Sequence, residues 1–354
     1  MTDTAAPFRI AWLEDRPEND LELARSLLPE TISIDLLPLV QSGHVSTDQA
    51  ELLGKADALL VQRTPVTDAL LEVAAKARLV QLYGVRDEVI DRESAERRGV
   101  TVAVMPMRGC IAVAELAMTL VLALSKQLIH AHQVTADGAY RGLGLEPIAT
   151  TQTKHAFQWM KLPGIFEVSG TTLGIIGLGE IGTELAQRAR AFGMRVLYNK
   201  RSRLPWRTEQ ALGVDWRERA ELLGESDFVV LALPYSEQVH NLIGTRELAQ
   251  MKRTAFLVNV ARGPLIDESA LLEALDARLI AGAGLDVFVE EPLRYDNPLA
   301  RSDRVILTPH IGGGSGGARE KQLSDVLGNI ALFANTGRAQ HAAPIGGGVT
   351  DGRN

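Results

Sequence analysis

The sequence predicts an α/β protein with two doubly wound parallel sheets, and three observations support that fold class. Short apolar runs of strand length alternate with helical patterns along most of the chain. The chain has 354 residues, which is enough for about two domains. One stretch in the middle, residues 172–203, reads as strand, glycine turn, helix and strand. Strands that alternate with helices at this spacing predict a parallel sheet covered on both faces.

The first 107 residues carry the pattern of one small α/β unit. Strands are predicted over 8–12, 56–61, 78–83 and 100–104, helices over 20–28 and 68–77, and a further apolar run over 32–40. One long helix is then predicted from 109 to about 133, because VAELAMTLVLALSKQ has an apolar face. Such a helix could join two domains.

The stretch 136–169 follows that helix and has no sustained period. It is long for an unstructured loop, so it is expected to wrap the surface or to cover a site. Phe157 and Trp159 within it are most simply anchors for the loop, and the alternative is a position over the substrate.

Residues 172–203 carry the strongest local motif. An apolar strand over 173–176 runs into Gly177, Gly179 and Gly182 at G-x-G-x-x-G spacing, and a helical pattern and a second strand at 195–198 follow. The first glycine permits a tight turn, the second lets a pyrophosphate approach the backbone, and the third lets helix and strand pack closely. Free N–H groups at the start of the helix then bind the phosphates. In this context the motif predicts a dinucleotide site.

The end of the second strand bears on which dinucleotide is bound. An NAD binder carries an acidic residue there, whereas this chain has Asn199 or Lys200. Four basic residues follow within eight positions: Lys200, Arg201, Arg203 and Arg207. A guanidinium can bind a 2′-phosphate through two hydrogen bonds, so this segment favours NADP. The alternative is a solvated basic loop.

Composition disfavours several classes of protein. Hydrophobic residues make up 46% and charged residues 23%, as in ordinary globular proteins. The net charge of −7 disfavours a nucleic-acid partner. Cys110 is the single cysteine, so no internal disulfide can form, and no metal site is expected. The N-terminus lacks the pattern of a signal peptide, and the apolar stretch 111–124 contains Glu115 and is too short to span a bilayer. A cytoplasmic enzyme without a membrane partner is therefore expected.

The alternation of strands and helices resumes after residue 203. Strands are predicted over 227–233, 255–260, 281–288 and 305–307, a helix begins at Asp267 as N-cap, and a closing helix covers 316–335.

Ligands of open α/β sheets bind beyond the carboxyl ends of the strands. Arg262, Asp286, Glu291 and His310 lie at or after such ends. An arginine can bind the carboxylate of a keto acid, an imidazolium can give its proton to the developing alkoxide, and a carboxylate can orient the imidazole. Taken singly, each could be a surface charge or a structural histidine, and their joint placement is what predicts a site.

Three motifs in order, NVARGPLIDESAL, AGAGLDVFVEEP and LTPHIGGG, follow GLGEIG. Together they resemble the signatures of the D-isomer-specific 2-hydroxyacid dehydrogenase family, most of all its NADPH-using glyoxylate and hydroxypyruvate reductases. The resemblance implies that Arg262, Glu291 and His310 are catalytic, and that Asp286 binds the nicotinamide carboxamide.

The resemblance also implies an architecture and a set of contacts. A flavodoxin-like substrate domain would comprise residues 1–107 and 311–354, and a Rossmann cofactor domain would comprise residues 108–310. A cleft would separate the two domains, and the assembly would be a homodimer. The implied substrate contacts are Gly84, Val85, Arg86, Arg262 and His310. The implied cofactor contacts are Gly177, Gly179, Glu180, Ile181, Gly182, Lys200, Arg201, Ser202, Arg203, Leu233, Pro234, Val260, Ala261, Arg262, Asp286, His310 and Gly312.

The chain departs from the family in three places. Arg86 replaces a glycine of the substrate loop, the usual Asn-Thr-Pro-Gly is Met-Pro-Met-Arg at 105–108, and the segment 136–169 is longer than typical. Arg86 could add a second cation for a longer or dianionic substrate, or it could be a solvated loop residue.

The predicted function is reduction of a small 2-keto acid, of the glyoxylate or hydroxypyruvate kind, to the D-2-hydroxy acid. NADPH is the preferred cofactor, and NAD remains possible. One alternative is oxidation of formate or phosphite on the same fold, although formate dehydrogenases carry glutamine where this chain has Glu291. Another is a dinucleotide-sensing binding protein like the family's corepressors, which retain the same three residues.

Overall fold

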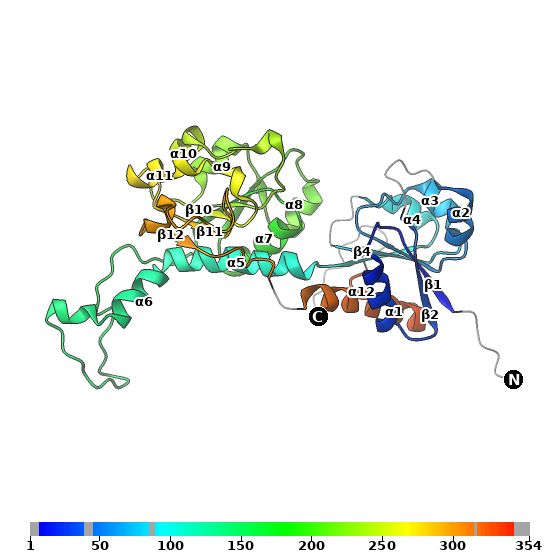
Figure 1. Cartoon of the computed structure of the whole chain (residues 1–354), viewed down its shortest axis with the longest axis horizontal. Coiled ribbons are helices and arrows are strands. Elements are labelled where there is room, and N and C mark those ends of the chain that lie inside the picture. Colours follow the sequence, from blue (N-terminus) through cyan, green and yellow to red (C-terminus); the bar gives the residue numbers. More distant parts are fainter. Residues whose placement is uncertain (1–6, 39–44, 85–88, 315–316, 343–354) are drawn as a thin grey trace. The chain divides into compact units, whose positions relative to one another are not determined.

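The computed structural model describes residues 7–38, 45–84, 89–314 and 317–342, which belong to two compact units (Figure 1). One unit comprises residues 1–108 and 316–354, and the other comprises residues 109–315. Each unit contains its own parallel sheet, of five and seven strands respectively among the described residues. The predicted fold class, α/β with two parallel sheets, is therefore confirmed.

The sheet of the first unit has the strand order β2-β1-β3-β4-β5, and all neighbours are parallel. Its strands are β1 (Phe8–Trp12), β2 (Ile32–Leu36), β3 (Ala58–Val61), β4 (Leu79–Tyr83) and β5 (Thr101–Met105). The neighbouring strands β3 and β4 are buried along their whole length, as expected for a parallel sheet covered on both faces.

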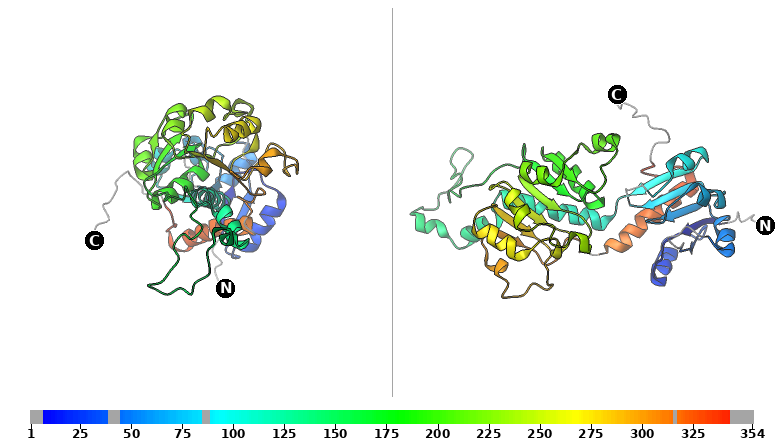
Figure 2. Two further views of the ribbon diagram at one scale, coloured as in Figure 1. Left: turned by 90° about the vertical axis from the view of Figure 1, so that its left-hand side faces the viewer. Right: turned by 90° about the horizontal axis from the view of Figure 1, so that it is seen from above.

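Helices cover both faces of this sheet. They are α1 (Glu18–Leu27), α2 (Thr47–Leu53), α3 (Asp68–Val73), α4 (Arg92–Arg97) and α12 (Ala318–Thr336). Apolar residues of α2, α3 and α4 form the core of one face, and those of α1 and α12 form the core of the other. Figure 2 shows α12, in orange, beside the N-terminal strands although it comes last in the sequence.

The sheet of the second unit has the strand order β12-β11-β10-β9-β6-β7-β8, again all parallel. Its strands are β6 (Thr172–Ile176), β7 (Arg195–Asn199), β8 (Asp215–Trp216), β9 (Phe228–Leu231), β10 (Phe256–Asn259), β11 (Gly282–Leu285) and β12 (Val305–Leu307). The order reverses at β6, because β7 lies on one side of it and β9 on the other. Such a reversal opens a crevice at the carboxyl edge where ligands bind.

Five helices of this unit sandwich the seven-stranded sheet (Figure 1). Residues of α5 (Arg108–Ser125) and α7 (Glu180–Ala191) pack on one face, and residues of α9 (Arg219–Glu225), α10 (Thr245–Gln250) and α11 (Glu268–Asp276) pack on the other. The helix α8 (Trp206–Leu212) connects β7 to β8, and short 3₁₀ turns occur at Ala139–Leu143, Glu237–Val239, Gly263–Leu265 and Pro298–Arg301.

The prediction of one helix over 109–133 is wrong, because two helices occupy that stretch. The first, α5, ends at Ser125, and α6 (Leu128–Ala136) begins after Gln127, whose backbone is left-handed with a φ of 49°. The Gln127 side chain also donates a hydrogen bond to the carbonyl of Pro163. The break has a physical cause, since α5 buries one face in the core whereas α6 has no buried residue.

By length and composition α5 alone, among the described helices, is apolar enough to cross a membrane. Its apolar face packs instead against the sheet. Leu120 and Leu124 lie so close to Gly284 of β11 that a Cβ at that glycine would approach them to 3.2 and 3.4 Å. The helix is accordingly a core element of the second unit.

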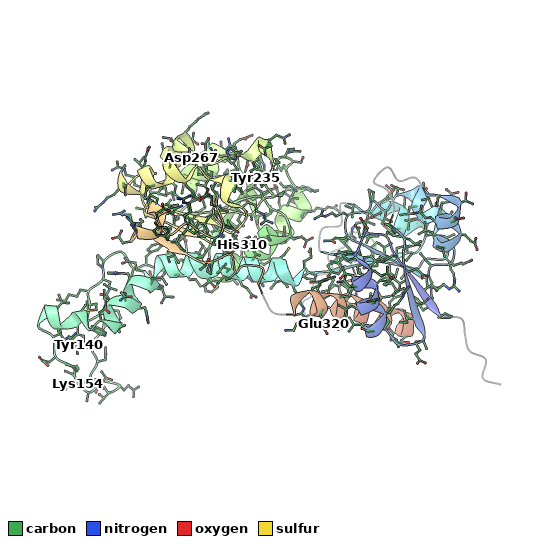
Figure 3. All side chains as sticks on the ribbon, in the orientation of Figure 1. Tyr140, Lys154, Tyr235, Asp267, His310 and Glu320 are labelled. Atoms are coloured by element: carbon green, nitrogen blue, oxygen red, sulfur yellow. The ribbon has the colours of Figure 1, made fainter. Side chains whose placement is uncertain are left out.

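The segment after α6 extends as an arm with little regular structure, and Figure 3 labels Tyr140 and Lys154 within it. Between the 3₁₀ turn at Ala139–Leu143 and β6 it contains no helix or strand. Trp159 anchors the arm through an edge-to-face contact with Tyr140, with ring centroids 5.8 Å apart. Phe157 is 87% exposed, so the prediction that it is an anchor is wrong.

Candidate active site

The glycine turn between β6 and α7 leaves no space for side chains at two positions. Gly177 has a left-handed φ of 99°, and a Cβ there would lie 2.6 Å from both the carbonyl oxygen of Ala232 and the Cβ of Leu233. A Cβ at Gly182 would lie 2.5 Å from the Gly177 carbonyl oxygen. The N-cap of α7, Gly179, also has no side chain to shield the helix start. This turn at residues 177–182, called the glycine cradle below, exposes backbone without side chains at the point where the strand order reverses. It fits the pyrophosphate of a dinucleotide.

The other predicted cofactor residues of this unit follow strands at the same edge of the sheet. Glu180 and Ile181 open α7, and Lys200 to Arg203 follow β7. Leu233 and Pro234 come after β9, Val260 to Arg262 after β10, Asp286 after β11, and His310 and Gly312 after β12. The carboxyl ends of parallel strands share one edge, so the structure brings these segments together as the sequence predicts.

Arg262 is held by the turn that follows β10. The buried side chain of Asn259 donates from Nδ2 to the Arg262 carbonyl at 2.9 Å and accepts from the Ala261 N–H at 3.0 Å. The next residue, Gly263, touches the chain at Phe288, where a Cβ would lie 1.9 Å from the backbone carbonyl carbon. This contact packs the turn that carries Arg262 against the segment that leads to Glu291. Asn259 was not among the predicted site residues, although it opens the NVARG motif.

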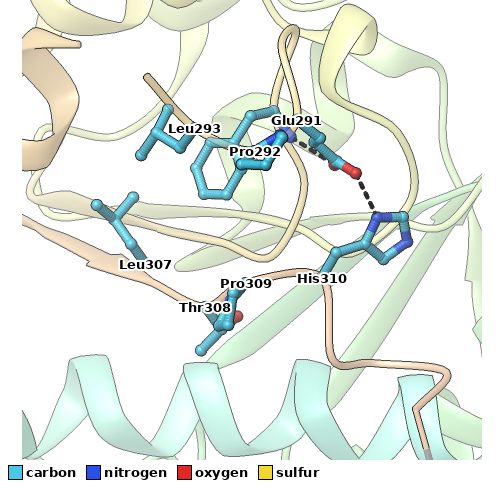
Figure 4. A pocket seen from close by; sticks show the side chains of 8 residues that line it. Glu291, Pro292, Leu293, Leu307, Thr308, Pro309 and His310 are labelled. Carbon is cyan, nitrogen blue, oxygen red and sulfur yellow. Dashed lines mark hydrogen bonds and ion pairs between the residues drawn. The ribbon is translucent and has the colours of Figure 1, made fainter. Parts of the chain in front are cut away.

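Glu291 and His310 form a directed pair (Figure 4). The Oε2 atom of Glu291 lies 2.6 Å from Nδ1 of His310, and its Oε1 atom accepts the backbone N–H of Phe288 at 3.1 Å. An ionised carboxylate can only accept, so Nδ1 carries the proton and donates it to Glu291. Among the described residues no group bonds to Nε2, which is therefore the nitrogen available to a substrate.

The environment of Glu291 keeps it ionised. Burial raises the pKa of its carboxyl, but the His310 hydrogen bond, the Phe288 N–H and the charges of His310 and Arg262 outweigh burial and hold that pKa below its ordinary value. The carboxylate is thus charged near neutral pH and can accept the Nδ1 proton of His310. Arg262 lies near enough to contribute to this field, so the three predicted catalytic groups act on one another.

Asp286 organises the loop that carries His310. Its side chain is 1% exposed and accepts from the Thr308 hydroxyl at 2.6 Å and from the N–H groups of Ile311 and Gly312, both at 2.9 Å. Its backbone carbonyl accepts the His310 N–H at 2.9 Å. His310 itself has a left-handed φ of 54°, a conformation that a non-glycine residue keeps only when its surroundings enforce it. Asp286 supplies that enforcement.

A pocket of about 560 Å³ lies beside the Glu291–His310 pair (Figure 4). It is lined by Phe288, Glu291, Pro292, Leu293, Leu307, Thr308, Pro309 and His310. Most of this lining is apolar, and an apolar wall strengthens the hydrogen bond between Glu291 and His310 at its rim.

The basic residues after β7 differ in whether they already have a partner. Arg203 forms a two-pronged ion pair with Glu209, with Nε and Nη2 at 2.9 and 2.8 Å from the two carboxylate oxygens. Arg201 is exposed and has no hydrogen-bond or ion-pair partner among the described residues. The Asn199 amide donates to the Arg217 carbonyl at 2.8 Å. Arg201 is thus available to bind an incoming anion, and it lies only two residues beyond the end of β7.

The predicted substrate loop lies in the first unit. Gly84 follows β4 with a φ of 148°, and its carbonyl accepts the Met105 N–H at 2.9 Å. Val85 and Arg86 lie outside the described residues. No group of three or more metal-ligating side chains occurs among the residues that the structure describes.

Taken together, the edge of the second sheet holds a dinucleotide cradle, a guanidinium and a carboxylate-oriented imidazole. Residues 118–312, more than half of the chain, match the family model described as D-isomer specific 2-hydroxyacid dehydrogenase, NAD binding domain.

Curated relatives and a solved structure match most of the chain. It is 38% identical to a glyoxylate reductase of Thermococcus gammatolerans over 322 residues, which cover 90% of each protein. It is 39% identical to a glyoxylate reductase of Thermococcus kodakarensis, with 90% of this chain and 91% of that protein covered. The crystal structure of a glyoxylate reductase from Paecilomyes thermophila superposes with a TM-score of 0.54 at 26% identity, covering 96% of this chain and 99% of that one.

Proposed function

Because this chain belongs to the D-isomer-specific 2-hydroxyacid dehydrogenase family of NAD(P)-dependent oxidoreductases, we propose that it reduces a small 2-keto acid to the D-2-hydroxy acid. Glyoxylate and hydroxypyruvate are the proposed substrates, and the glyoxylate reductases among its relatives support this choice. The observation that carries the proposal is the 2.6 Å contact between Glu291 and Nδ1 of His310, beside Arg262. It equips one imidazole to act as a general acid.

The proposed mechanism assigns one task to each group. The guanidinium of Arg262 binds the substrate carboxylate and polarises the adjacent carbonyl. Nε2 of His310 donates a proton to the carbonyl oxygen as negative charge develops there. Glu291 keeps Nδ1 protonated and stabilises the imidazolium from which that proton leaves. A bound nicotinamide cofactor supplies the hydride.

We propose NADPH as the preferred cofactor. The adenosine ribose of a dinucleotide on the glycine cradle would meet the end of β7, where Asn199 and Lys200 replace an acidic residue. Exposed Arg201 follows directly and is free to pair with a 2′-phosphate. NADH is expected to bind more weakly, because it offers this arginine no phosphate.

Replacing Arg201 with alanine is expected to raise KM for NADPH about ten- to a hundredfold and to leave KM for NADH nearly unchanged. One charge-assisted phosphate contact contributes about 1.5–3 kcal/mol, which corresponds to that range. Steady-state kinetics with each cofactor measure it. The matched control is Arg253→Ala, an exposed arginine ahead of β10 and so at the opposite edge of the sheet. Equal KM values for both cofactors in the unmodified protein would refute the preference.

The activity itself is tested by following NADPH and NADH oxidation with a panel of 2-keto acids, together with chiral analysis of the product. Turnover of glyoxylate or hydroxypyruvate with NADPH is the expected result. Tight cofactor binding without turnover of any keto acid would instead favour a dinucleotide-sensing protein. Reduction of NADP⁺ by formate or phosphite would favour the remaining alternative.

We further propose that residues 108–310 form the cofactor domain and that 1–107 with 311–354 form the substrate domain. The family model for the NAD binding domain, which matches residues 118–312, supports the first assignment. A cytoplasmic homodimer is the proposed assembly, in line with the family. Size-exclusion chromatography with light scattering tests the assembly directly.

A further inference from the structure

One buried carboxylate beside the cofactor edge has no task in the mechanism above. Glu209 lies on α8, and only 5% of it is exposed. Its Oε1 atom accepts from the Tyr198 hydroxyl at 2.7 Å and from Nε of Arg203 at 2.9 Å, and its Oε2 atom accepts from Nη2 of Arg203 at 2.8 Å. A buried charge is costly unless it is paired in this way, so the pairing is a specific feature of the fold.

Together with one further bond, these hydrogen bonds connect the two ends of the segment 199–204. The hydroxyl of Tyr198, at the end of β7, accepts the backbone N–H of Leu204 at 2.8 Å while it donates to Glu209. The guanidinium of Arg203 also lies 6.0 Å from the centre of the Trp216 ring. The segment is therefore tied to β7 at one end and to α8 and β8 at the other.

The charge states support the same arrangement. The Arg203 hydrogen bonds lower the pKa of Glu209, so this carboxylate is ionised near neutral pH. Burial and the bond to Glu209 raise the pKa of Tyr198 to about 12, so its hydroxyl keeps the proton that it donates. The pairing of Arg203 with a carboxylate also occupies two of its donors, whereas Arg201 keeps all of its own.

We propose that Glu209 is a positioning residue for cofactor specificity. Its ion pair with Arg203 holds the segment 199–204 in one conformation, in which Arg201 can bind the 2′-phosphate of NADPH. This inference rests on the proposed preference for NADPH and adds a residue that never touches the cofactor. A segment ordered before binding need not lose its conformational freedom when the phosphate arrives.

The test compares the dissociation constants of NADP⁺ and NAD⁺ for the unmodified chain, Glu209→Gln, Arg201→Ala and the double variant, by isothermal titration calorimetry. Glu209→Gln keeps the size of the side chain but removes its charge. It is expected to weaken NADP⁺ binding about tenfold, the effect of reordering one or two residues on binding, and to leave NAD⁺ binding unchanged. Because Glu209 acts through Arg201, the double variant is expected to match Arg201→Ala alone.

Two further variants complete the design. Tyr198→Phe removes only the hydroxyl that binds Leu204 and Glu209, and it is expected to weaken NADP⁺ binding in the same sense. It keeps the inference testable if Glu209→Gln does not fold. Glu221→Gln, on the exposed side of α9, is the matched control and is expected to change neither constant.

Several outcomes would overturn the inference. Tighter NADP⁺ binding by Glu209→Gln would mean that a released Arg203 itself binds the phosphate. Equal weakening of NADP⁺ and NAD⁺ binding by Glu209→Gln would assign Glu209 a structural role only. If the effects of the two single substitutions added in full in the double variant, Glu209 would not act through Arg201. Equal binding of NADP⁺ and NAD⁺ by the unmodified chain would refute the cofactor preference, and the inference with it, before any variant is measured.

Discussion

Replacing His310 with alanine is expected to lower kcat for keto-acid reduction about 10²- to 10⁴-fold, the usual contribution of one general acid. In the proposed mechanism this side chain donates the proton that neutralises the developing alkoxide. Among the described residues, Glu291 orients no other side chain that could give a proton. Binding of the dinucleotide should persist, because the glycine cradle is separate from the imidazole. Stopped-flow measurement of NADPH oxidation with saturating keto acid gives the chemical step directly.

The control for this variant is His155→Ala, an exposed histidine of the arm. It is expected to retain the activity of the unmodified chain. Near-normal kcat in His310→Ala would refute the mechanism, whichever keto acid proves to be the substrate.

The dependence of kcat on pH tests the pairing with Glu291. The proposed mechanism needs the imidazole of His310 to be held by an ionised Glu291, so reductive kcat should fall on the acid side as that carboxyl gains a proton. Burial raises the pKa of Glu291 but its hydrogen bonds lower it overall, so this fall is expected only below the ordinary range of a glutamate. Glu291→Gln has no carboxyl to titrate, and its lower kcat should lack this fall at acid pH. An unchanged profile, with chemistry shown to limit the rate, would contradict the pairing.

Replacing Asp286 with alanine is expected to destabilise the protein and to slow catalysis. The change leaves the Thr308 hydroxyl and the N–H groups of Ile311 and Gly312 without their acceptor in a partly buried site. Such losses cost about 2–5 kcal/mol in total, which corresponds to a fall in Tm of roughly 4–15 °C. The His310 loop is then free to shift, and a displacement of about 1 Å can cost about 10²-fold in rate.

Differential scanning calorimetry and single-turnover kinetics measure the two effects. The exposed Asp276→Ala, at the end of α11, is the matched control and should change neither. If Asp286→Ala kept both its Tm and its kcat, Asp286 would have no role in organising the loop. A rise in KM for the cofactor would add support for the predicted contact with the nicotinamide carboxamide.

Much of the fold follows from local pattern alone. The predicted strand at 305–307 has the observed bounds, and the strands near 8–12 and 195–198 agree to within one residue, because each is a short apolar run between turn residues. Shorter or less periodic elements were missed, among them α2, α4 and α8. Six or seven residues make fewer than two turns, which is too little for a helical period to stand out.

The sequence by itself determined which segments of the chain meet at the site. Strands that alternate with helices must be parallel, and parallel strands bring their carboxyl ends to one edge, so the motifs around Gly177, Arg262 and His310 were bound to meet there. The glycine spacing likewise determined a phosphate cradle, because only glycine tolerates the close backbone approach seen at Gly177 and Gly182.

Only the tertiary structure decided how individual polar groups are used. Asp286 binds the loop that carries His310, Asn259 binds the turn that carries Arg262, and Arg203 pairs with Glu209. The break at Gln127 is of the same kind, since α5 and α6 share one apolar pattern but only α5 has a core to pack against. A polar side chain has several possible partners of similar energy, and the choice among them depends on which distant groups folding brings within about 3 Å.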